Sequence, residues 1–343
     1  LGPFGGTSRP NAEQTTLQNE DAIDAIITWV DGSDPKWQAK KDKLLGREDN
    51  SENVSATRYA DNDEIYYCLA SILKNAPFIR RIHIVTDNQR PDAIDRLTKT
   101  FGQAATDKIS IVDHTEIFRG YEEYLPTFNS ISIESMLHRI SGLAEKYIYF
   151  NDDVLLLRPS VANDFFCNGK AMLRGEVRTV APIRVLRLAK SLGSTVFDAR
   201  ILDRVSYKEV QCNAAEILGA VKKFFWHDHT PHPFLKSDIE SFFCSHQSLL
   251  VSNISHRTRH KSQFLVSALQ NNLNYLKSTR EIHPTNLLYL KFSTGSDQRH
   301  YLKRKMRSAE IQDPMFLCVQ GLDNARPETK KIFLKWLDQL VLL

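Results

Sequence analysis

The stretch Tyr147-Ile148-Tyr149-Phe150-Asn151-Asp152-Asp153 is a short apolar run followed at once by an asparagine and two carboxylates. An apolar run of this length, bounded by turn residues, predicts a buried strand with the two acids at its carboxyl end. Adjacent carboxylates in that position can hold a hard divalent cation such as Mg²⁺ through oxygen ligands. A strand-ending turn with two solvated acids is the structural alternative.

Three earlier segments repeat this pattern of an apolar strand that ends in an acid. Their ranges are 23–30, 82–86 and 109–112, and they end in Asp31-Gly32, Asp87 and Asp113. Ligands bind beyond the carboxyl ends of parallel strands, so four such endings predict a ligand site at one rim of a sheet. Aspartate is also a common turn residue, and any one of these acids could serve only a turn.

Helical periodicity fills the intervals between the strands, over 63–74, 91–101 and 129–143. Strands that alternate with helices predict an α/β fold, namely a mostly parallel sheet with helices on both faces. Helix is also expected in the second half, at 211–225, from Ser237 onward and at 263–276.

The composition is that of a globular protein. Of 343 residues, 42% are hydrophobic and 25% are charged, which excludes a disordered or low-complexity chain. No apolar run reaches the roughly 20 residues of a membrane span, and no signal peptide is visible. The five cysteines are scattered without a CxxC pair, which favours reduced thiols in a cytosolic protein. We expect one catalytic domain over 13–343, with 1–12 a disordered end or an expression remnant.

Positive charge gathers late in the chain. The formal net charge is +4, yet residues 256–307 hold eleven Lys or Arg against two acids. Such a stretch suits a phosphate-rich ligand; a solvated basic face and a surface that meets anionic lipid are the alternatives. Within it, Arg257 and Arg259 offer planar forks for bidentate phosphate contact. Nucleic acid is not expected, because interleaved aromatic residues are lacking.

A histidine-rich turn, Trp226-His227-Asp228-His229-Thr230-Pro231-His232-Pro233, precedes the basic stretch. Its prolines predict that a loop presents His229 and His232. A neutral histidine can accept a hydroxyl proton near pH 7. Zinc is not expected because no third ligand is evident nearby, and histidines that only pack or cap are the alternative.

Two further polar positions have sufficient structural explanations. Asn62 or Asp63 could cap the helix over 63–74, and Asn129 could cap the helix over 129–143.

Together these motifs resemble the Stealth family of hexose-1-phosphate transferases. That family includes bacterial capsule polymerases and the animal enzyme that tags lysosomal glycoproteins with GlcNAc-1-phosphate. The resemblance rests on residues 23–35, 58–64, 84–89, 125–130 with Glu134, and 149–153. Their order and spacing are similar to the family's first two regions.

The later motifs are a looser match. Residues 229–232 resemble the family's catalytic-histidine turn, and 256–260 resemble its arginine motif, with Arg259 as the functional arginine. Where the family reads Cys-Leu-Asn-Asp, this chain reads Cys318-Val319-Gln320-Gly321-Leu322-Asp323. Gly321 therefore replaces the expected acid, and Asp323 is the candidate substitute.

The resemblance implies a nucleotide-sugar transferase-like fold in which 23–155 binds the donor and a helix-rich half, 156–343, brings His229 and Arg259. It implies transfer of a sugar-1-phosphate, of N-acetylhexosamine type, from a UDP-sugar to an acceptor hydroxyl. UMP would leave and a phosphodiester would form, as in capsule synthesis.

The resemblance also implies roles for single residues. Asp152, Asp153 and Asp323 would hold Mg²⁺ or Mn²⁺, His229 would accept the hydroxyl proton, and Arg259 would neutralise phosphate oxygens. Substrate contacts would come from Trp29, Asp31, Arg58, Asp63, Asp87, Gln89, Asn129, His232 and His260.

The expected partners are the UDP-sugar donor and a saccharide or glycan acceptor. We expect a cytoplasmic location, with peripheral association at the inner face of the membrane and the oligomeric state left open. An ordinary glycosyltransferase that releases UDP is one alternative, and a non-catalytic nucleotide-sugar-binding protein on the same fold is another.

Overall fold

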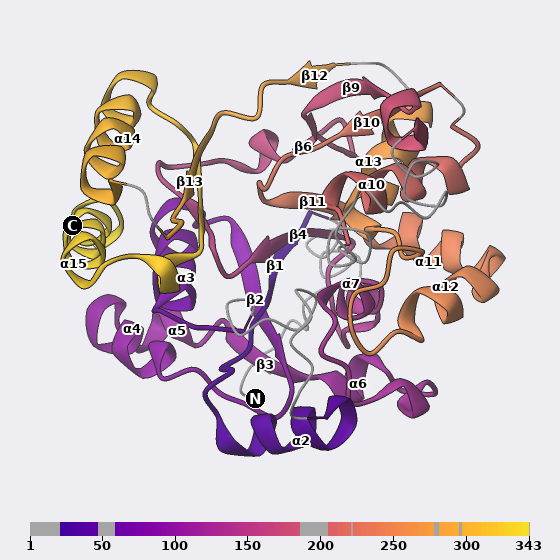
Figure 1. Cartoon of the computed structure of the whole chain (residues 1–343), viewed down its shortest axis with the longest axis horizontal. Helices are drawn as coiled ribbons and strands as arrows, with labels where there is room; N and C mark the ends of the chain where they lie inside the picture. The colour runs from indigo at the N-terminus through magenta and orange to yellow at the C-terminus, as the bar shows by residue number, and fades with distance from the viewer. Residues whose placement is uncertain are drawn as a thin grey trace, which may run out of the picture.

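A five-stranded sheet lies at the centre of the molecule (Figure 1). The computed structural model describes residues 21–46, 59–185, 205–220, 222–277, 281–294 and 297–342. Residues 1–12 and the predicted substrate contact Arg58 lie outside these ranges. In spatial order the strands are β11 (His232–Leu235), β4 (Lys146–Asn151), β1 (Ile23–Thr28), β2 (Ile79–Thr86) and β3 (Ile109–Asp113).

The sheet is mostly parallel, as the sequence predicts. β1 pairs in parallel with both β2 and β4, β2 pairs in parallel with β3, and β11 adds an antiparallel edge beside β4. The chain runs from β1 outward to β3 and then returns to the other side of β1. The carboxyl ends of β1 and β4 therefore flank the point where the strand order reverses, which is where ligands bind in open α/β sheets.

Helices connect the parallel strands. They are α2 (Pro35–Leu45), α3 (Glu64–Asn75), α4 (Ala93–Phe101), α5 (Gln103–Thr106), α6 (His114–Ile117) and α7 (Ser130–Glu134). The predicted helix over 129–143 is correct only at its start. It becomes the short α7 and a 3₁₀ turn at Leu137–Arg139. Ser135 Oγ donates to the Ile131 carbonyl (2.8 Å), and a side chain bonded to the preceding turn competes with the helix.

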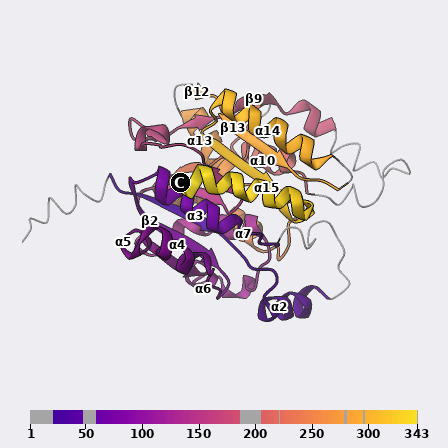
Figure 2. The same cartoon turned by 90° about the vertical axis from the view of Figure 1, so that its left-hand side faces the viewer.

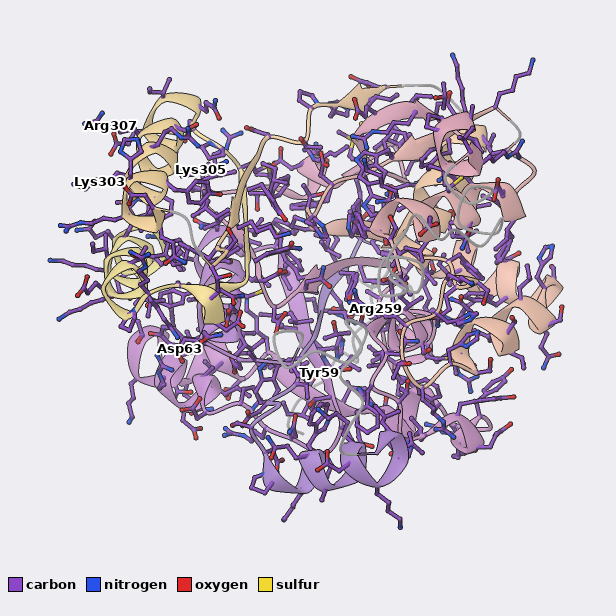
Figure 3. The ribbon with its side chains drawn as sticks, in the orientation of Figure 1. Tyr59, Asp63, Arg259, Lys303, Lys305 and Arg307 are labelled. Carbon is purple, nitrogen blue, oxygen red and sulfur yellow. The ribbon has the colours of Figure 1, made fainter. Side chains whose placement is uncertain are left out.

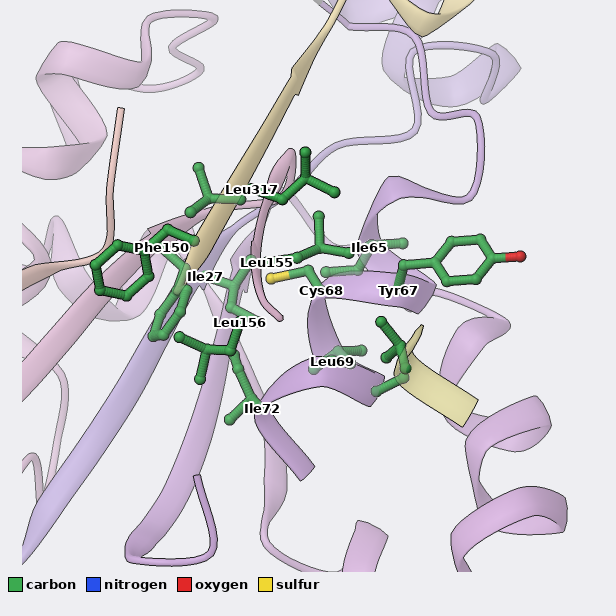
Figure 4. Packing of buried hydrophobic residues seen from close by; sticks show 14 of the residues in the cluster. Ile27, Ile65, Tyr67, Cys68, Leu69, Ile72, Phe150, Leu155, Leu156 and Leu317 are labelled. Carbon is green, nitrogen blue, oxygen red and sulfur yellow. The ribbon is translucent and has the colours of Figure 1, made fainter. Parts of the chain in front are cut away.

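Both faces of the sheet are covered, because strand side chains alternate between two cores. Ile27 of β1 and Phe150 of β4 enter the first core, whereas Ile26 and Tyr149 enter the second. The first core packs α3 against a three-stranded sheet of β13 (Leu287–Lys291), β14 (Phe316–Gln320) and β5 (Val154–Leu156). Figure 4 shows Ile65, Leu69 and Ile72 of α3 facing Leu155, Leu156 and Leu317, with Tyr67 directed away from them.

The second core is closed by helices of the later part of the chain. They are α10 (Tyr207–Ile217), α11 (Lys236–Ser245), α12 (Gln247–Ile254) and α13 (Val266–Lys277). α14 (Gln298–Gln312), α15 (Pro327–Leu337) and the π-helical turn at Asp338–Leu342 lie on the opposite side, beside α3 (Figures 1 and 2). None of the helices in the described ranges combines the length and the apolar character needed to span a bilayer.

Short strand pairs complete the later part of the chain. β9 (Glu176–Thr179) pairs with β10 (Lys223–Trp226), β8 (Leu173–Arg174) with β12 (Ile282–His283), and β6 (Phe166–Cys167) with β7 (Lys170–Ala171). The predicted helix over 211–225 is wrong beyond Ile217, because Gly219 takes a left-handed φ of 83° that stops α10. Residues 223–225, read as helix, instead belong to β10.

Candidate active site

Two carboxylates follow β4 at the reversal point of the sheet. The Asp152-Asp153 turn joins β4 to β5, and the Asp153 carbonyl accepts from Val319 N of β14 (2.9 Å). The Cys318 thiol is 3.8 Å from Asp153 Oδ2 and donates to it, whereas Asp153 Oδ1 is buried without a hydrogen-bond partner. A buried carboxylate oxygen without a donor is costly, so this atom is suited to a cation.

Two further carboxylates act on this pair. They are Asp61, just before α3, and Glu64, the first residue of α3. Burial raises the pKa of Asp152, and the charges of Asp153, Glu64 and Asp61 raise it further. Burial also raises the pKa of Glu64, to about 7, against a hydrogen bond from Asn62 N. Trp29 Nε1 donates to Asp61 Oδ2 (2.9 Å), which ties this segment to the end of β1. The arrangement concentrates negative charge that a divalent cation would relieve.

The fit to a cation is that of an open site. Within the ranges that the structure describes, no three His, Cys, Asp or Glu side chains form a closed metal site. Mg²⁺ typically takes only one or two protein carboxylates and fills its other positions with water and phosphate oxygens. The free Oδ1 of Asp153, next to Asp152, is compatible with that coordination.

Asp323 lies apart from this pair in its interactions. Its carboxylate is exposed and accepts from Asn324 Nδ2 (3.3 Å), and it is not among the largest causes of the pKa shifts of Asp152 and Asp153. Gln320, in the same motif, accepts a hydrogen bond at Oε1 from the Tyr289 hydroxyl (2.6 Å).

Arg259 brings positive charge to the same place. Its Nη2 donates to Ser130 Oγ (2.8 Å) at the start of α7, and Figure 3 shows it near Tyr59 in the middle of the molecule. Burial raises the pKa of Asp153 and the charge of Arg259 opposes that rise. Burial likewise raises the pKa of Glu134 to about 7, again opposed by Arg259. The guanidinium therefore acts on carboxylates from two sides of the site.

Asn129 fixes the backbone that carries Arg259. Its Nδ2 lies within hydrogen-bond distance of the carbonyls of His256 (3.0 Å) and Thr258 (2.8 Å) and of Gln263 Oε1 (2.9 Å). Its Oδ1 accepts from Ile131 N (3.1 Å), so it also caps α7. The Asn129 amide is fully buried and is used in these contacts. Asn129 is therefore a positioning residue, whereas the resemblance implied a substrate contact.

His229 lies between two tyrosine rings on the loop between β10 and β11. Its ring stacks on Tyr207 (centroids 4.4 Å apart, 17° between planes) and is also nearly parallel to Tyr289 (6.1 Å, 16°). Burial, with a smaller contribution from the charge of Arg259 and against the charge of Asp228, lowers the pKa of His229 to about 4. Arg259 thus acts electrostatically on both His229 and Asp153, and Tyr289 is the strand partner of Cys318, the residue that donates to Asp153.

The prolines predicted that a loop presents His232, and this prediction is wrong. It is the first residue of β11, pairs with Tyr149 of β4, and is buried with its ring 4.2 Å from that of His227. Burial lowers the pKa of His232 well below its ordinary value. Pro233 is accepted here because β11 is an edge strand.

Sequence comparison matches residues 21–49 to the family model of Stealth protein CR1, conserved region 1, and residues 58–173 to that of Stealth protein CR2, conserved region 2. The receptor polysaccharide phosphotransferase WefC of Streptococcus oralis is 32% identical over 265 residues, which cover 70% of this chain and 74% of WefC. The chain belongs to the Stealth family.

Other relatives match over shorter lengths. The capsular polysaccharide phosphotransferase cps1A of Actinobacillus pleuropneumoniae is 38% identical over 197 residues, which cover 56% of this Stealth chain and 51% of cps1A. The chain thus spans about half the length of the first capsular relatives it matches. Among solved structures, the galactosyltransferase LgtC with donor and acceptor sugar analogues aligns over 93% of this chain and 97% of LgtC, at 12% identity and a TM-score of 0.43.

The remaining predicted contacts of the Stealth chain fall into two groups. Trp29, Asp31 and Gln89 line the end of β1, where Gln89 Nε2 donates to the Asp31 carbonyl (3.0 Å) and to Asp34 Oδ2 (3.1 Å). Asp31 Oδ1 accepts from Ser33 N (2.8 Å) and Ser33 Oγ (2.6 Å).

The second group points elsewhere. Asp63 pairs with Arg96 (2.6 Å) and Asp87 with Lys40 (2.8 Å). His260 is exposed and stacks on His256, with centroids 4.3 Å apart. These side chains make no described contact with Asp152, Asp153, Arg259 or His229.

Sequence reasoning missed the side chains that shape the Stealth site without carrying a motif. Tyr207 and Tyr289 enclose His229 from positions far away along the chain, and nothing in their local sequence marks them. Glu64 and Asp61 could have been predicted from the sequence, since they lie beside Asp63, which the resemblance implied as a substrate contact. Their neighbour Asp63 takes a left-handed φ of 72°, and its carboxylate pairs with Arg96.

Proposed function

We propose that this Stealth protein transfers an N-acetylhexosamine-1-phosphate from a UDP-sugar to the hydroxyl of a saccharide acceptor. The proposal is supported by three groups near the reversal point of the sheet, because Arg259 acts electrostatically on both of the others. They are the partnerless Oδ1 of Asp153, the guanidinium of Arg259 and the imidazole of His229. The names of WefC and cps1A as polysaccharide phosphotransferases support the same reaction class.

In the proposed reaction the acceptor oxygen attacks the phosphorus that bears the sugar. A phosphorus–oxygen bond forms to the acceptor, and the bond from that phosphorus to the oxygen bridging to the uridylate phosphorus breaks. UMP leaves with that bridging oxygen, and the product is a phosphodiester. The anomeric carbon–oxygen bond is untouched, so the donor's configuration is kept.

Arg259 and His229 have distinct tasks in this reaction. The fixed guanidinium of Arg259 faces non-bridging oxygens whose charge must be stabilised in the transition state, and preorganised charge is typically the largest contribution in phosphoryl transfer. A ring nitrogen of neutral His229 accepts the hydroxyl proton. Its pKa of about 4 keeps it neutral at working pH, and a bound diphosphate would raise that pKa by its negative charge.

Asp152 and Asp153 are the residues that would hold Mg²⁺ or Mn²⁺. When bound, such an ion neutralises diphosphate charge and assists departure of UMP. The Cys318 thiol, which donates to Oδ2 of Asp153, leaves Oδ1 directed to this role. We extend the proposal to a cytoplasmic protein with peripheral membrane association, consistent with synthesis of a surface polysaccharide.

The test is to incubate the protein with a panel of UDP-, GDP- and CMP-sugars and a saccharide acceptor, and to separate the released nucleotides by chromatography. Release of UMP together with a phosphorus-containing product is expected. Release of UDP would replace the proposal with an ordinary glycosyltransferase. Tight donor binding without consumption would replace it with a nucleotide-sugar-binding protein.

The cation is tested in parallel. Treatment with EDTA should stop turnover, and Mg²⁺ should restore it. Binding of Mn²⁺, followed by electron paramagnetic resonance without any substrate, should be lost in Asp153→Asn. Full turnover in chelator would dismiss the metal role of Asp152 and Asp153.

A further inference from the structure

A basic groove lies between α3 and α15, outside the site described above. It has a volume of about 540 Å³ and is lined by Tyr67, Lys330, Lys331, Leu334, Lys335 and Asp338. We propose that this α3–α15 groove binds a phosphodiester of the growing acceptor glycan. The inference rests on the proposed function, because a chain built by sugar-phosphate transfer carries one negative charge at each new linkage.

The charges in the groove are not neutralised by the groove itself. The one lining carboxylate, Asp338, accepts from the Tyr67 hydroxyl (2.7 Å). Lys330 Nζ donates to a neutral amide oxygen, Asn62 Oδ1 (2.7 Å). Lys331 and Lys335 are exposed and have no carboxylate partner in the described ranges. The groove therefore presents three ammonium groups to a ligand against one carboxylate.

The groove is connected to the carboxylate cluster by a short chain of contacts. Lys330 holds the side chain of Asn62, and the Asn62 backbone N–H donates to Glu64. Glu64 in turn acts electrostatically on Asp152. The Asn62–Glu64 segment therefore borders both the groove and the carboxylate cluster.

α14, which packs against α15, carries further positive charge. Arg299, Lys303 and Arg307 recur every four residues and are exposed, so they share one face of the helix. Arg304 is also exposed, and none of these four pairs with a carboxylate in the described structure. Figure 3 shows Lys303 and Arg307 at the outer side of α14, and Figure 2 shows α14 lying next to α15.

The shape of the surface favours a glycan over a lipid bilayer. A helix that lies in a membrane interface needs an apolar face beside its basic one. On α14, Leu302 is buried and Met306 packs against the core, which leaves Ile311 as the one large hydrophobic residue exposed among those described on α14 and α15. A concave groove with lysines along its edge suits separate phosphates on a flexible chain.

The experiment compares Lys331→Gln/Lys335→Gln with a matched control, Lys99→Gln/Lys223→Gln, which neutralises two exposed lysines on α4 and β10. The probes are poly(glycerol phosphate), neutral dextran, and vesicles of phosphatidylcholine and phosphatidylglycerol in equal parts. Affinity is measured by calorimetry across a salt series. We expect the groove variant to bind poly(glycerol phosphate) about 5- to 30-fold more weakly, with a shallower salt dependence, and the control variant to bind it as the wild type does.

Several outcomes overturn the inference. They are equal affinity of the wild type and the groove variant for poly(glycerol phosphate), equal binding of dextran by the wild type, and a loss confined to vesicles, which would assign the lysines to a lipid surface. The binding measurement needs no turnover, so release of UDP in place of UMP would reject the proposed function and leave this result readable. If both hold, the kcat/KM ratio for long anionic over short neutral acceptors should fall in the groove variant.

Discussion

A buried carboxylate within one strand of the sheet and a half-buried carboxylate just beyond the neighbouring strand have opposite environments. Asp24, within β1, receives Arg80 Nε (2.9 Å), Arg80 Nη2 (2.6 Å) and the Ala144 N–H (2.9 Å). Burial alone would raise its pKa, but hydrogen bonds from His83 and Arg80 bring it down to about 2. Asp153, just beyond β4, keeps one oxygen without a partner, and burial raises its pKa.

The difference separates structure from function. A carboxylate whose charge is compensated inside the protein stabilises the fold, whereas one whose charge is left to be compensated by a ligand destabilises the empty protein and favours binding. Asp152, Glu64 and Asp61 belong with Asp153, since burial and mutual repulsion raise the pKa of Asp152. Asp87, paired with Lys40, belongs with Asp24.

The largest expected effect is that of Asp153→Asn. Turnover should fall about 10³-fold or more, because loss of the proposed cation would remove several kcal/mol of transition-state stabilisation. The melting temperature of the metal-free protein should nevertheless rise, since a neutral amide removes the penalty of a buried, unpaired charge. Both are measured on purified protein, by UMP release and by calorimetry. The control Asp113→Asn keeps an acceptor for the cap of α6 and should alter turnover less than about threefold.

His229→Ala should lower kcat roughly 10²- to 10³-fold by removing the proton acceptor, and leave donor affinity nearly unchanged. Because the pKa of His229 is about 4 in the free protein, its own titration should appear in kcat/KM only as pH falls toward 4 and not between pH 6 and 8. Stopped assays from pH 4 to pH 8 check the pH dependence, and calorimetry checks that donor affinity is unchanged. Wild-type turnover in this variant would remove His229 from the mechanism.

Asp24→Asn should lower the free energy of unfolding by about 2 kcal/mol at pH 7, because the lowered pKa of Asp24 is converted into stability at about 1.4 kcal/mol per pKa unit. The folded value is about 2 against an ordinary value of 3.8. The contribution is therefore present above about pH 4 and is lost as pH falls toward 2. Urea unfolding from pH 7 down to pH 3 should show the difference between wild type and variant shrinking. A constant difference would contradict the assignment.

The smallest expected effect is that of Asp87→Asn, which breaks a pair whose lysine is 43% exposed. Exposed ion pairs contribute little, and the free energy of unfolding should change by less than about 0.5 kcal/mol. Donor KM should also stay near the wild-type value if Lys40 fully engages Asp87. A rise of tenfold in donor KM would restore Asp87 as the substrate contact that the sequence suggested.

The order of strands and helices in the first half was readable from the sequence, because each strand is a short apolar run and each is followed by a helical period. The same reading failed at 218–220, 223–225 and 135–143. Phe224, Phe225, Met136 and Leu137 are buried there, but Gly219 and the hydrogen bond of Ser135 to the preceding turn change the backbone that carries them. β11 was missed because two of its four residues are histidine and proline, and it exists through its pairing with β4.

The sequence by itself determined the alternating α/β pattern, the acids at strand ends and the motifs that place the chain in the Stealth family, since these depend on local periodicity and spacing. Only the tertiary structure decided which of these acids have their charge compensated by a partner within the protein. Asp24, Asp87, Asp113 and Asp153 are all carboxylates in or after a strand, and their partners Arg80, Lys40, Asn88 and Cys318 lie 25 to 165 residues away along the chain. Burial and the placing of opposite charge are properties of the packed chain, and they set whether a carboxylate supports the fold or awaits a ligand.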